Sequence, residues 1–236
     1  MKKILYPLLL VVLTACSPSH RQISLNYLNQ CNQGNTTACH RYLYGNGRNL
    51  SYNEIFDMMK YICNNGGYYY NSSGGNKPDY CFLVADGYLN GVDKVKGSDK
   101  IKIEKNIPLA IEYFDKGCFA KNKREANSCL QLAEMYYQGK IVSKNFSKAL
   151  KYAEQSCTRS FGTMQTQAKS CFMLGQMYEK GQGTKRNYAI AENYYRDACS
   201  MNSGDYCHYH KKFMARHGDE TNVVRKGNIH RFLKNK

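Results

Sequence analysis

Residues 171–199 read CFMLGQMYEKGQGTKRNYAIAENYYRDAC. Small and apolar residues recur at helical spacing in both halves of this stretch, and a Gly-Gln-Gly turn separates the halves. The recurring positions are Cys171, Leu174, Gly175 and Tyr178 in the first half and Ala191, Tyr194, Tyr195 and Ala198 in the second. The pattern predicts a unit of helix, glycine turn and helix, with a cysteine at each end.

The same unit recurs along the chain. Residues 129–157 align with residues 171–199 without a gap at an offset of 42, with nine identical positions. A third copy at 81–118 carries nine extra residues between Val92 and Glu104, and a shorter copy occupies 39–63. Such a unit cannot bury its apolar face alone, so its copies must stack. We therefore expect an all-α solenoid of about four units over residues 31–207, followed by a C-terminal cap and basic tail over 208–236.

The motif resembles the Sel1-like repeat, a relative of the tetratricopeptide repeat. The residues that carry the resemblance are Cys171, Leu174, Gly175, Tyr178, Gly181, Gln182 and Gly183, followed by Asn187, Tyr188, Ala191, Tyr194, Tyr195 and Ala198. With cysteines in both helices, the unit is similar to the Helicobacter cysteine-rich proteins in particular. Ala133 and Ile141 depart from the glycine pattern. The resemblance implies a right-handed α-α solenoid.

The N-terminus has the features of an export signal. Two lysines and an apolar run, residues 2–13, precede small residues and then Cys16. The run is too short to be a permanent membrane helix. Leu13-Thr14-Ala15-Cys16 resembles the bacterial lipobox, which implies cleavage before Cys16 and acylation of its thiol; the alternative is an ordinary signal peptide with a cysteine nearby. We expect a signal peptide over 1–15 and a lipid-anchored tether over 16–30.

Eleven cysteines less the lipidated one leave ten, an even number that favours disulfides in an exported chain. The family resemblance implies bridges between successive units, Cys31–Cys39, Cys63–Cys81, Cys118–Cys129, Cys157–Cys171 and Cys199–Cys207. Zinc binding is the competing interpretation, but the sequence contains no C-x2-C pair. We expect neither a metal nor another cofactor.

The chain is strongly basic. Removal of residues 1–15 takes away two lysines and no acid, so the formal net charge falls from +16 to +14. This charge favours acidic partners, although it can also reflect composition and solubility alone. An exported lipoprotein seldom meets nucleic acid, so that partner is not expected. The basic tail is either a contact for anionic lipid or a solvated end.

The cysteine-rich relatives are described as binding penicillin and hydrolysing β-lactams, which makes a β-lactamase the alternative function. The mature sequence contains no S-x-x-K, K-T-G or G-x-S-x-G motif. His208 and His210, the nearest approach to a metal-ligand cluster, are interpreted as surface residues of the cap. The enzyme assignment therefore rests on the resemblance alone.

Repeat solenoids bind extended partners on the concave side, which the first helix of each unit lines. We therefore expect a scaffold that binds a protein, a peptide or a peptidoglycan fragment in the bacterial envelope, or a secreted factor acting on a host protein. The candidate contact residues are Phe82, Asp86, Asn127, Leu130, Glu134, Tyr137, Gln138, Lys169, Phe172, Gln176, Glu179 and Lys180.

Overall fold

The computed structural model describes residues 20–46, 50–65, 79–96, 99–119, 126–158, 163–201 and 204–234; within these ranges, residues 20–22, 46, 94–96, 99–101 and 221–234 are described by their backbone alone. The expected signal peptide and the expected lipidation site, Cys16, lie outside these residues. No helix in the described ranges is both long and apolar enough to cross a membrane.

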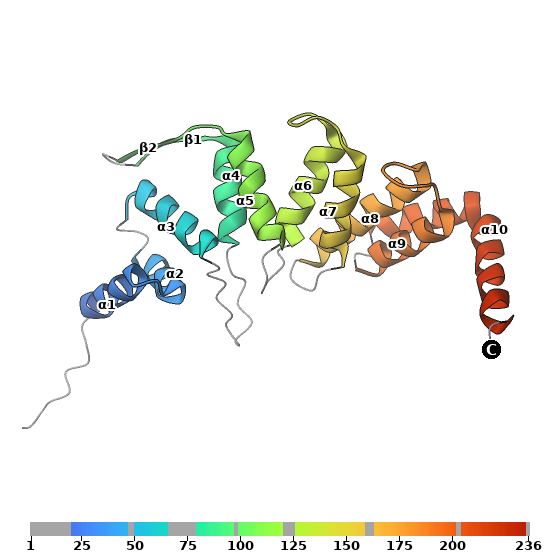
Figure 1. Ribbon diagram of the computed structural model, residues 1–236, viewed down its shortest axis with the longest axis horizontal. Helices are drawn as coiled ribbons and strands as arrows, with labels where there is room; N and C mark the ends of the chain where they lie inside the picture. The colour runs from blue at the N-terminus through green and yellow to red at the C-terminus, as the bar shows by residue number, and fades with distance from the viewer. Residues whose placement is uncertain are drawn as a thin grey trace, which may run out of the picture.

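The described residues form ten helices and one hairpin, which follow one another along the molecule in chain order (Figure 1). The elements are α1 (His20–Asn32), α2 (Thr36–Asn46), α3 (Tyr52–Asn64), α4 (Tyr80–Asn90), β1 (Val92–Lys96), β2 (Asp99–Ile103), α5 (Ile107–Phe119), α6 (Ala126–Gln138), α7 (Phe146–Cys157), α8 (Met164–Lys180), α9 (Tyr188–Met201) and α10 (Asp205–Lys234). The pairs α4–α5, α6–α7 and α8–α9 pack within units, and each unit packs on the next. The predicted fold class, a solenoid with disulfides, is confirmed.

A glycine and an asparagine shape the turn inside each unit. Gly181 ends α8 in the left-handed conformation, at φ 68°, which glycine adopts without steric cost. The backbone N–H of Asn187 then donates to the carbonyl oxygen of Tyr178. The side chain of Asn187 accepts from the backbone N–H of Ile190 and so caps α9. The same pair of hydrogen bonds occurs at Asn106 and Asn145.

A tyrosine from each helix of a unit meets its counterpart inside the unit. Tyr136 and Tyr152 stack with ring centroids 5.9 Å apart. The equivalent pairs are Tyr88 with Tyr113 and Tyr178 with Tyr194, at 5.8 and 5.7 Å. These recurring tyrosines therefore serve the packing of the two helices against each other.

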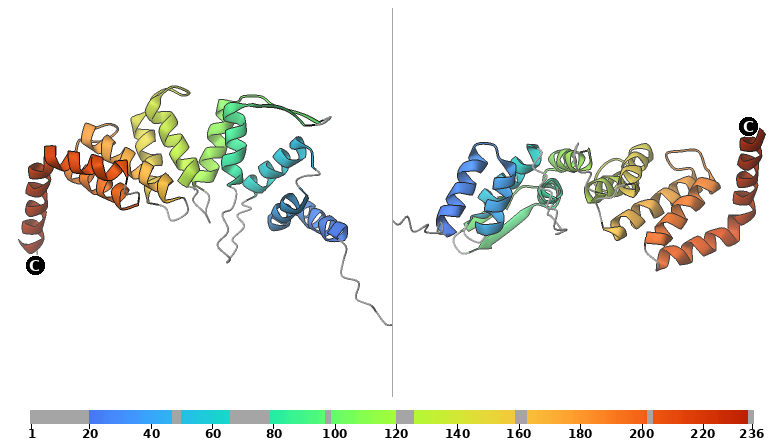
Figure 2. Two further views of the ribbon diagram at one scale, coloured as in Figure 1. Left: turned by 180° about the vertical axis from the view of Figure 1, so that it is seen from behind. Right: turned by 90° about the horizontal axis from the view of Figure 1, so that it is seen from below.

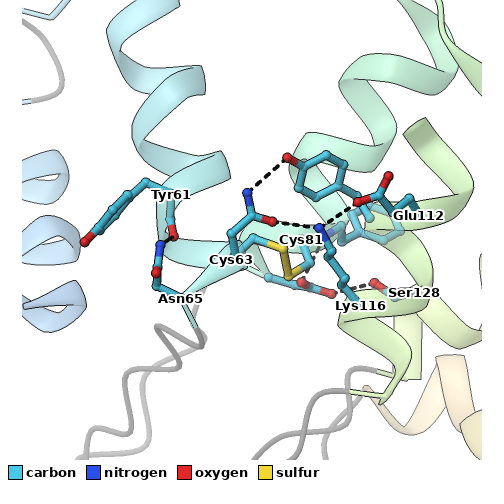
Figure 3. Close-up of a disulfide and its surroundings, with 11 residues drawn as sticks. Tyr61, Cys63, Asn65, Cys81, Glu112, Lys116 and Ser128 are labelled. Atoms are coloured by element: carbon cyan, nitrogen blue, oxygen red, sulfur yellow. Dashed lines mark hydrogen bonds and ion pairs between the residues drawn. A yellow bond between two sulfur atoms is a disulfide. The ribbon is translucent and has the colours of Figure 1, made fainter. Parts of the chain in front are cut away.

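Five disulfides join the ten cysteines at the junctions between successive helix pairs. They are Cys31–Cys39, Cys63–Cys81, Cys118–Cys129, Cys157–Cys171 and Cys199–Cys207, the pairs that the family resemblance implies. Figure 3 shows Cys63–Cys81, where α3 meets α4. Beside it, Lys116 of α5 donates to the side-chain oxygens of Asn64 and Glu112 and so ties α5 to the end of α3.

Small side chains let the helices approach beside these disulfides. Ser156 and Ser170 each precede a bridged cysteine, and their hydroxyl oxygens lie 2.6 Å apart. At the preceding junction Gly117 stands in the place of Ser156. A Cβ at Gly117 would lie 2.5 Å from the hydroxyl oxygen of Ser128. The residue before each of these cysteines is therefore restricted in size.

The extra residues of the unit at 81–118 lie in an antiparallel hairpin. Strands β1 and β2 pair from Val92 with Ile103 to Lys96 with Asp99, and the hairpin extends from α4 and α5 toward α3 (Figure 1). Isoleucine and lysine alternate in β2, which places Ile103 on the side of α3 and α4. The fold is thus helical except for this hairpin.

Both ends of the described chain are more helical than expected. The expected tether over 16–30 is helical from His20 onward, because Leu28 and Cys31 are one turn apart and Cys31 is buried against α2. At the other end, the cap and the basic tail form one helix, α10, of 30 residues. The views from behind and from below show α10 projecting from the last unit (Figure 2). Buried Phe213 anchors its first half.

Candidate binding surface and the C-terminal cap

The first helices of the three clear units, α4, α6 and α8, contact one another in succession and form one layer. Of the twelve expected contact residues, only Asp86, Gln138, Lys169 and Lys180 are exposed. Leu130 is buried in the main core, so the expectation that it faces a ligand is wrong. The helical period placed Leu130 on α6 but could not show that it packs into the main core. The remaining seven are half-buried; they are Phe82, Asn127, Glu134, Tyr137, Phe172, Gln176 and Glu179.

Several half-buried residues of this layer bind the next unit. Glu134 of α6 forms an ion pair of 2.5 Å with Lys169 of α8. Asn127 accepts a hydrogen bond from the hydroxyl of Thr166, and the hydroxyl of Tyr137 donates to the side-chain oxygen of Gln182. These contacts orient the units relative to one another, so substitutions at Glu134 or Asn127 would change the scaffold as well as its surface.

Three exposed residues form a row at the glycine-turn edge of the layer. Asn90, Gln138 and Lys180 occupy the last position of α4, α6 and α8, and all three are exposed. Asn90 donates to Asp86 within α4. The row therefore offers two amides, one carboxylate and one ammonium group to a partner, on helices that the disulfides hold in place.

Phe172 and Glu179 of α8 belong to the contact between the last unit and the cap. The ring of Phe172 packs against those of Tyr195, Tyr206 and Tyr209, with centroids 4.9 to 5.5 Å apart. Glu179, with a side chain only 10% exposed, accepts hydrogen bonds from the hydroxyls of Tyr195 and Tyr209. These two residues hold α8, α9 and α10 together.

Basic side chains of α10 contact two carboxylates of the last unit that have little exposure to solvent. Arg216 lies 3.4 Å from Glu179, and His210 lies 3.3 Å from Glu192, whose side chain is 4% exposed. Arg196 also pairs with Glu192, at 3.3 Å. The cap is therefore attached by aromatic rings, by the ion pair between Arg216 and Glu179 and by the contact of His210 with Glu192.

Of this cluster, only Glu179 was an expected contact residue, and His210, which was expected on the surface of the cap, is instead half-buried against Glu192. Glu192 directly follows the buried Ala191 and lies one turn before the buried Tyr195, and an acid at such a position signals a polar or charged partner. That signal identifies the acid, but the periodicity of α10 does not show which of its histidines and arginines would meet it.

Burial changes the acid–base properties of two groups near these contacts. Burial, followed by the hydrogen bond to Glu179, raises the pKa of Tyr195, which keeps its hydroxyl a donor. Burial also raises the pKa of Asp79 at the start of α4 and outweighs the opposing effect of hydrogen bonds from the backbone of Phe82 and the hydroxyl of Ser128. Within the described residues, no three or more His, Cys, Asp or Glu side chains are grouped so as to hold a metal ion.

Comparison with known proteins identifies the repeat. The Sel1 repeat model matches residues 78–118, 126–161 and 168–203, which contain the pairs α4–α5, α6–α7 and α8–α9. No curated protein matches the chain.

The solved structures that are similar to this chain include the following three. Helicobacter pylori cysteine rich protein B is 27% identical, over 44% of this chain and 71% of that one, with a TM-score of 0.38. A Sel1 repeat protein from Oxalobacter formigenes is 19% identical, over 67% and 98%, with a TM-score of 0.49. A protective antigen of uropathogenic Escherichia coli strains is 16% identical, over 86% and 44%, with a TM-score of 0.35.

Proposed function

Because this chain is a Sel1-repeat protein, we propose that it is a non-catalytic scaffold that binds an extended protein or peptide segment along the exposed row of α4, α6 and α8. The observation that carries the proposal is the equivalent, exposed placement of Asn90, Gln138 and Lys180 in three consecutive units. An extended chain that follows the array would meet these side chains in turn. Hydrogen bonds and one cation then supply specificity without requiring a deep pocket.

The disulfides support this proposal through preorganisation. A scaffold that is already ordered loses little conformational entropy when it binds, so more of the contact free energy appears as affinity. The helix pairs that carry the row are joined to one another by disulfides, each beside a buried small residue, as at Cys157–Cys171.

A matched pair of variants tests the surface. Gln138→Glu with Lys180→Glu alters the row, whereas Ser147→Glu with Lys151→Glu makes the same charge change on exposed residues of α7. In affinity capture from bacterial envelopes, we expect the first variant to lose a specifically captured protein that the second retains. Equal capture by both variants, at unchanged unfolding temperatures, would place the partner elsewhere.

We also propose that the scaffold is exported and anchored by lipid on Cys16. The five disulfides support export, because they persist in oxidising compartments. The lipobox resemblance of residues 13–16 supports the anchor. Mass spectrometry of the membrane fraction should find an acylated N-terminal Cys16, and Cys16→Ser should release the protein from the membrane. An unmodified mature N-terminus at another residue would contradict the anchor.

The contacts of the described residues give no specific support to β-lactam hydrolysis, so we do not propose it. A peptidoglycan fragment remains a second type of ligand for the same row, since amide and ammonium groups also suit a glycopeptide. Competition of the captured protein with purified muropeptides distinguishes the two ligands.

A further inference from the structure

A pocket of about 430 Å³ lies in the N-terminal part of the molecule, where α1 and α2 face α3. Its apolar wall consists of Leu28, Leu50 and Met58. Cys31, which forms a disulfide with Cys39, also lines the pocket. The volume falls in the range of ligand-binding pockets. The pocket is separate from the row on α4, α6 and α8, so it does not depend on the function proposed above.

Aromatic rings flank the apolar wall. Tyr42 and Tyr61 line the pocket from α2 and α3. The ring of Tyr61 points away from the Cys63–Cys81 disulfide, toward the N-terminal helices (Figure 3). A Cβ at Gly34, in the turn between α1 and α2, would lie 3.8 Å from the Tyr61 hydroxyl. Tyr61 therefore reaches across from α3 to the opposite side.

The charge of the pocket is opposite to that of the chain. Its described lining contains two acids, Glu54 and Asp57, and no basic residue, although the chain carries a net charge of +16. Hydrogen bonds from the backbone N–H and then the hydroxyl of Ser51 lower the pKa of Glu54, which keeps this carboxylate ionised. The pocket thus presents negative charge beside apolar and aromatic surface.

One cation lies close to this lining. Lys60, one turn from Asp57 on α3, forms an ion pair of 2.6 Å with it, and the Asp57 side chain is 70% exposed. Exposed pairs of this kind contribute little free energy. A guanidinium or ammonium group of a ligand can therefore replace Lys60 beside Asp57 with little loss of free energy.

We propose that this pocket binds a short cationic peptide segment. The head of an arginine or lysine side chain lies beside Asp57 and Glu54, and its methylene stem contacts the ring of Tyr61. A neighbouring apolar side chain fills the rest of the pocket against Leu28 and Met58. The juxtaposition of two carboxylates, two tyrosines and an apolar wall selects this ligand over an anionic or a purely apolar one.

The test uses N-acetyl-leucyl-arginine amide as the probe and the oxidised, full-length protein. Titration followed by amide chemical shifts should show saturable changes in α1, α2 and α3 with millimolar or tighter affinity. Asp57→Asn should weaken binding about tenfold, which corresponds to one charge-assisted hydrogen bond. Glu112→Gln is the matched control, because it also removes an exposed acid paired with a lysine, on α5.

The neutral isostere, with citrulline in place of arginine, tests whether the cation matters. We expect it to bind at least tenfold more weakly than the arginyl probe. The proposal is overturned if the two probes bind equally, if Asp57→Asn and Glu112→Gln have the same affinity, if the shifts map to α4, α6 and α8, or if the arginyl probe does not bind. Thermal unfolding of each variant shows that the fold is intact.

Discussion

The hydroxyl of Tyr195 donates a hydrogen bond of 2.5 Å to the carboxylate of Glu179. Tyr195 is fully buried on α9, and Glu179 lies in the last turn of α8 and also accepts from Tyr209 of α10. One carboxylate therefore holds three helices together at the end of the solenoid. This contact adds to the attachment of the cap, which the Cys199–Cys207 disulfide and the rings around Phe172 also hold.

Replacing Tyr195 by phenylalanine should remove the hydrogen bond to Glu179 and lower the stability of the protein. The variant keeps the ring but leaves the nearly buried Glu179 with one donor fewer, so we expect a loss of about 2 kcal/mol in the free energy of unfolding. Chemical denaturation measures this loss. Tyr44→Phe is the control, because Tyr44 is 78% exposed and should change stability by less than about 0.5 kcal/mol. Equal stability of the two variants would contradict the role of Tyr195.

Substitution by alanine should have different effects on stability at two glycines in helices. A Cβ at Gly175 in α8 would lie 2.5 Å from the ring of Tyr195, whereas one at Gly45 in α2 meets no atom within 4 Å. Alanine normally stabilises a helix interior by about 0.5 to 1 kcal/mol relative to glycine. We therefore expect Gly45→Ala to be neutral or stabilising and Gly175→Ala to lower the melting temperature. If Gly175→Ala is also neutral, α8 and α9 are not packed as closely as described.

Loss of a disulfide should act locally, because stability in a solenoid is a sum of neighbour contacts. Removing Cys157–Cys171 by alanine substitutions should cost about 3 kcal/mol and raise amide hydrogen exchange in α7 and α8. Removing Cys31–Cys39 should raise exchange in α1 and α2 alone. Exchange that rises uniformly along the chain in both variants would show that the units are not the cooperative elements.

Asp79 should make stability depend on pH in a direction opposite to that of most carboxylates. Burial raises its pKa in the folded state above the value of about 3.9 in the unfolded chain. As pH rises above about 4, the unfolded state releases this proton first, so the folded state loses stability. Asparagine in this position can still cap α4 and bond Ser128.

The stability of the wild type relative to Asp79→Asn should therefore fall as the pH rises from about 3 through the raised folded-state pKa of Asp79. Urea unfolding of both proteins across this range measures the difference, and the other carboxylates cancel in it. A difference that is constant or rises with pH would mean that Asp79 is not effectively buried.

The sequence predicted the parts of the fold that depend on local spacing. Cysteines and glycines at a fixed offset define the units, and Asn187 caps its helix from within the same turn. The hairpin was not predicted, although Ile101 and Ile103 alternate with lysines, because the repeat pattern on both sides of it is helical.

The candidate surface was only partly predictable, because contacts between distant segments decide it. Helical period places Glu134 and Glu179 on the first-helix layer. It does not show that Lys169 pairs with Glu134 or that Tyr195 donates a hydrogen bond to Glu179. Because of these contacts, Glu134 and Glu179 serve the packing of the helices more than they serve an exposed surface. The pocket lined by Tyr61 likewise requires the approach of α1 to α3, which no periodicity encodes.

The binding function is tested most directly by photocrosslinking in living cells. A benzophenone amino acid is placed at Gln138 or Lys180 on the exposed row and, separately, at exposed Ser147 on α7. We predict that one discrete partner is crosslinked from Gln138 and Lys180 and not from Ser147. No crosslink at the row, or the same crosslinked partner from all three positions, would contradict the proposal that the first helices form the binding surface.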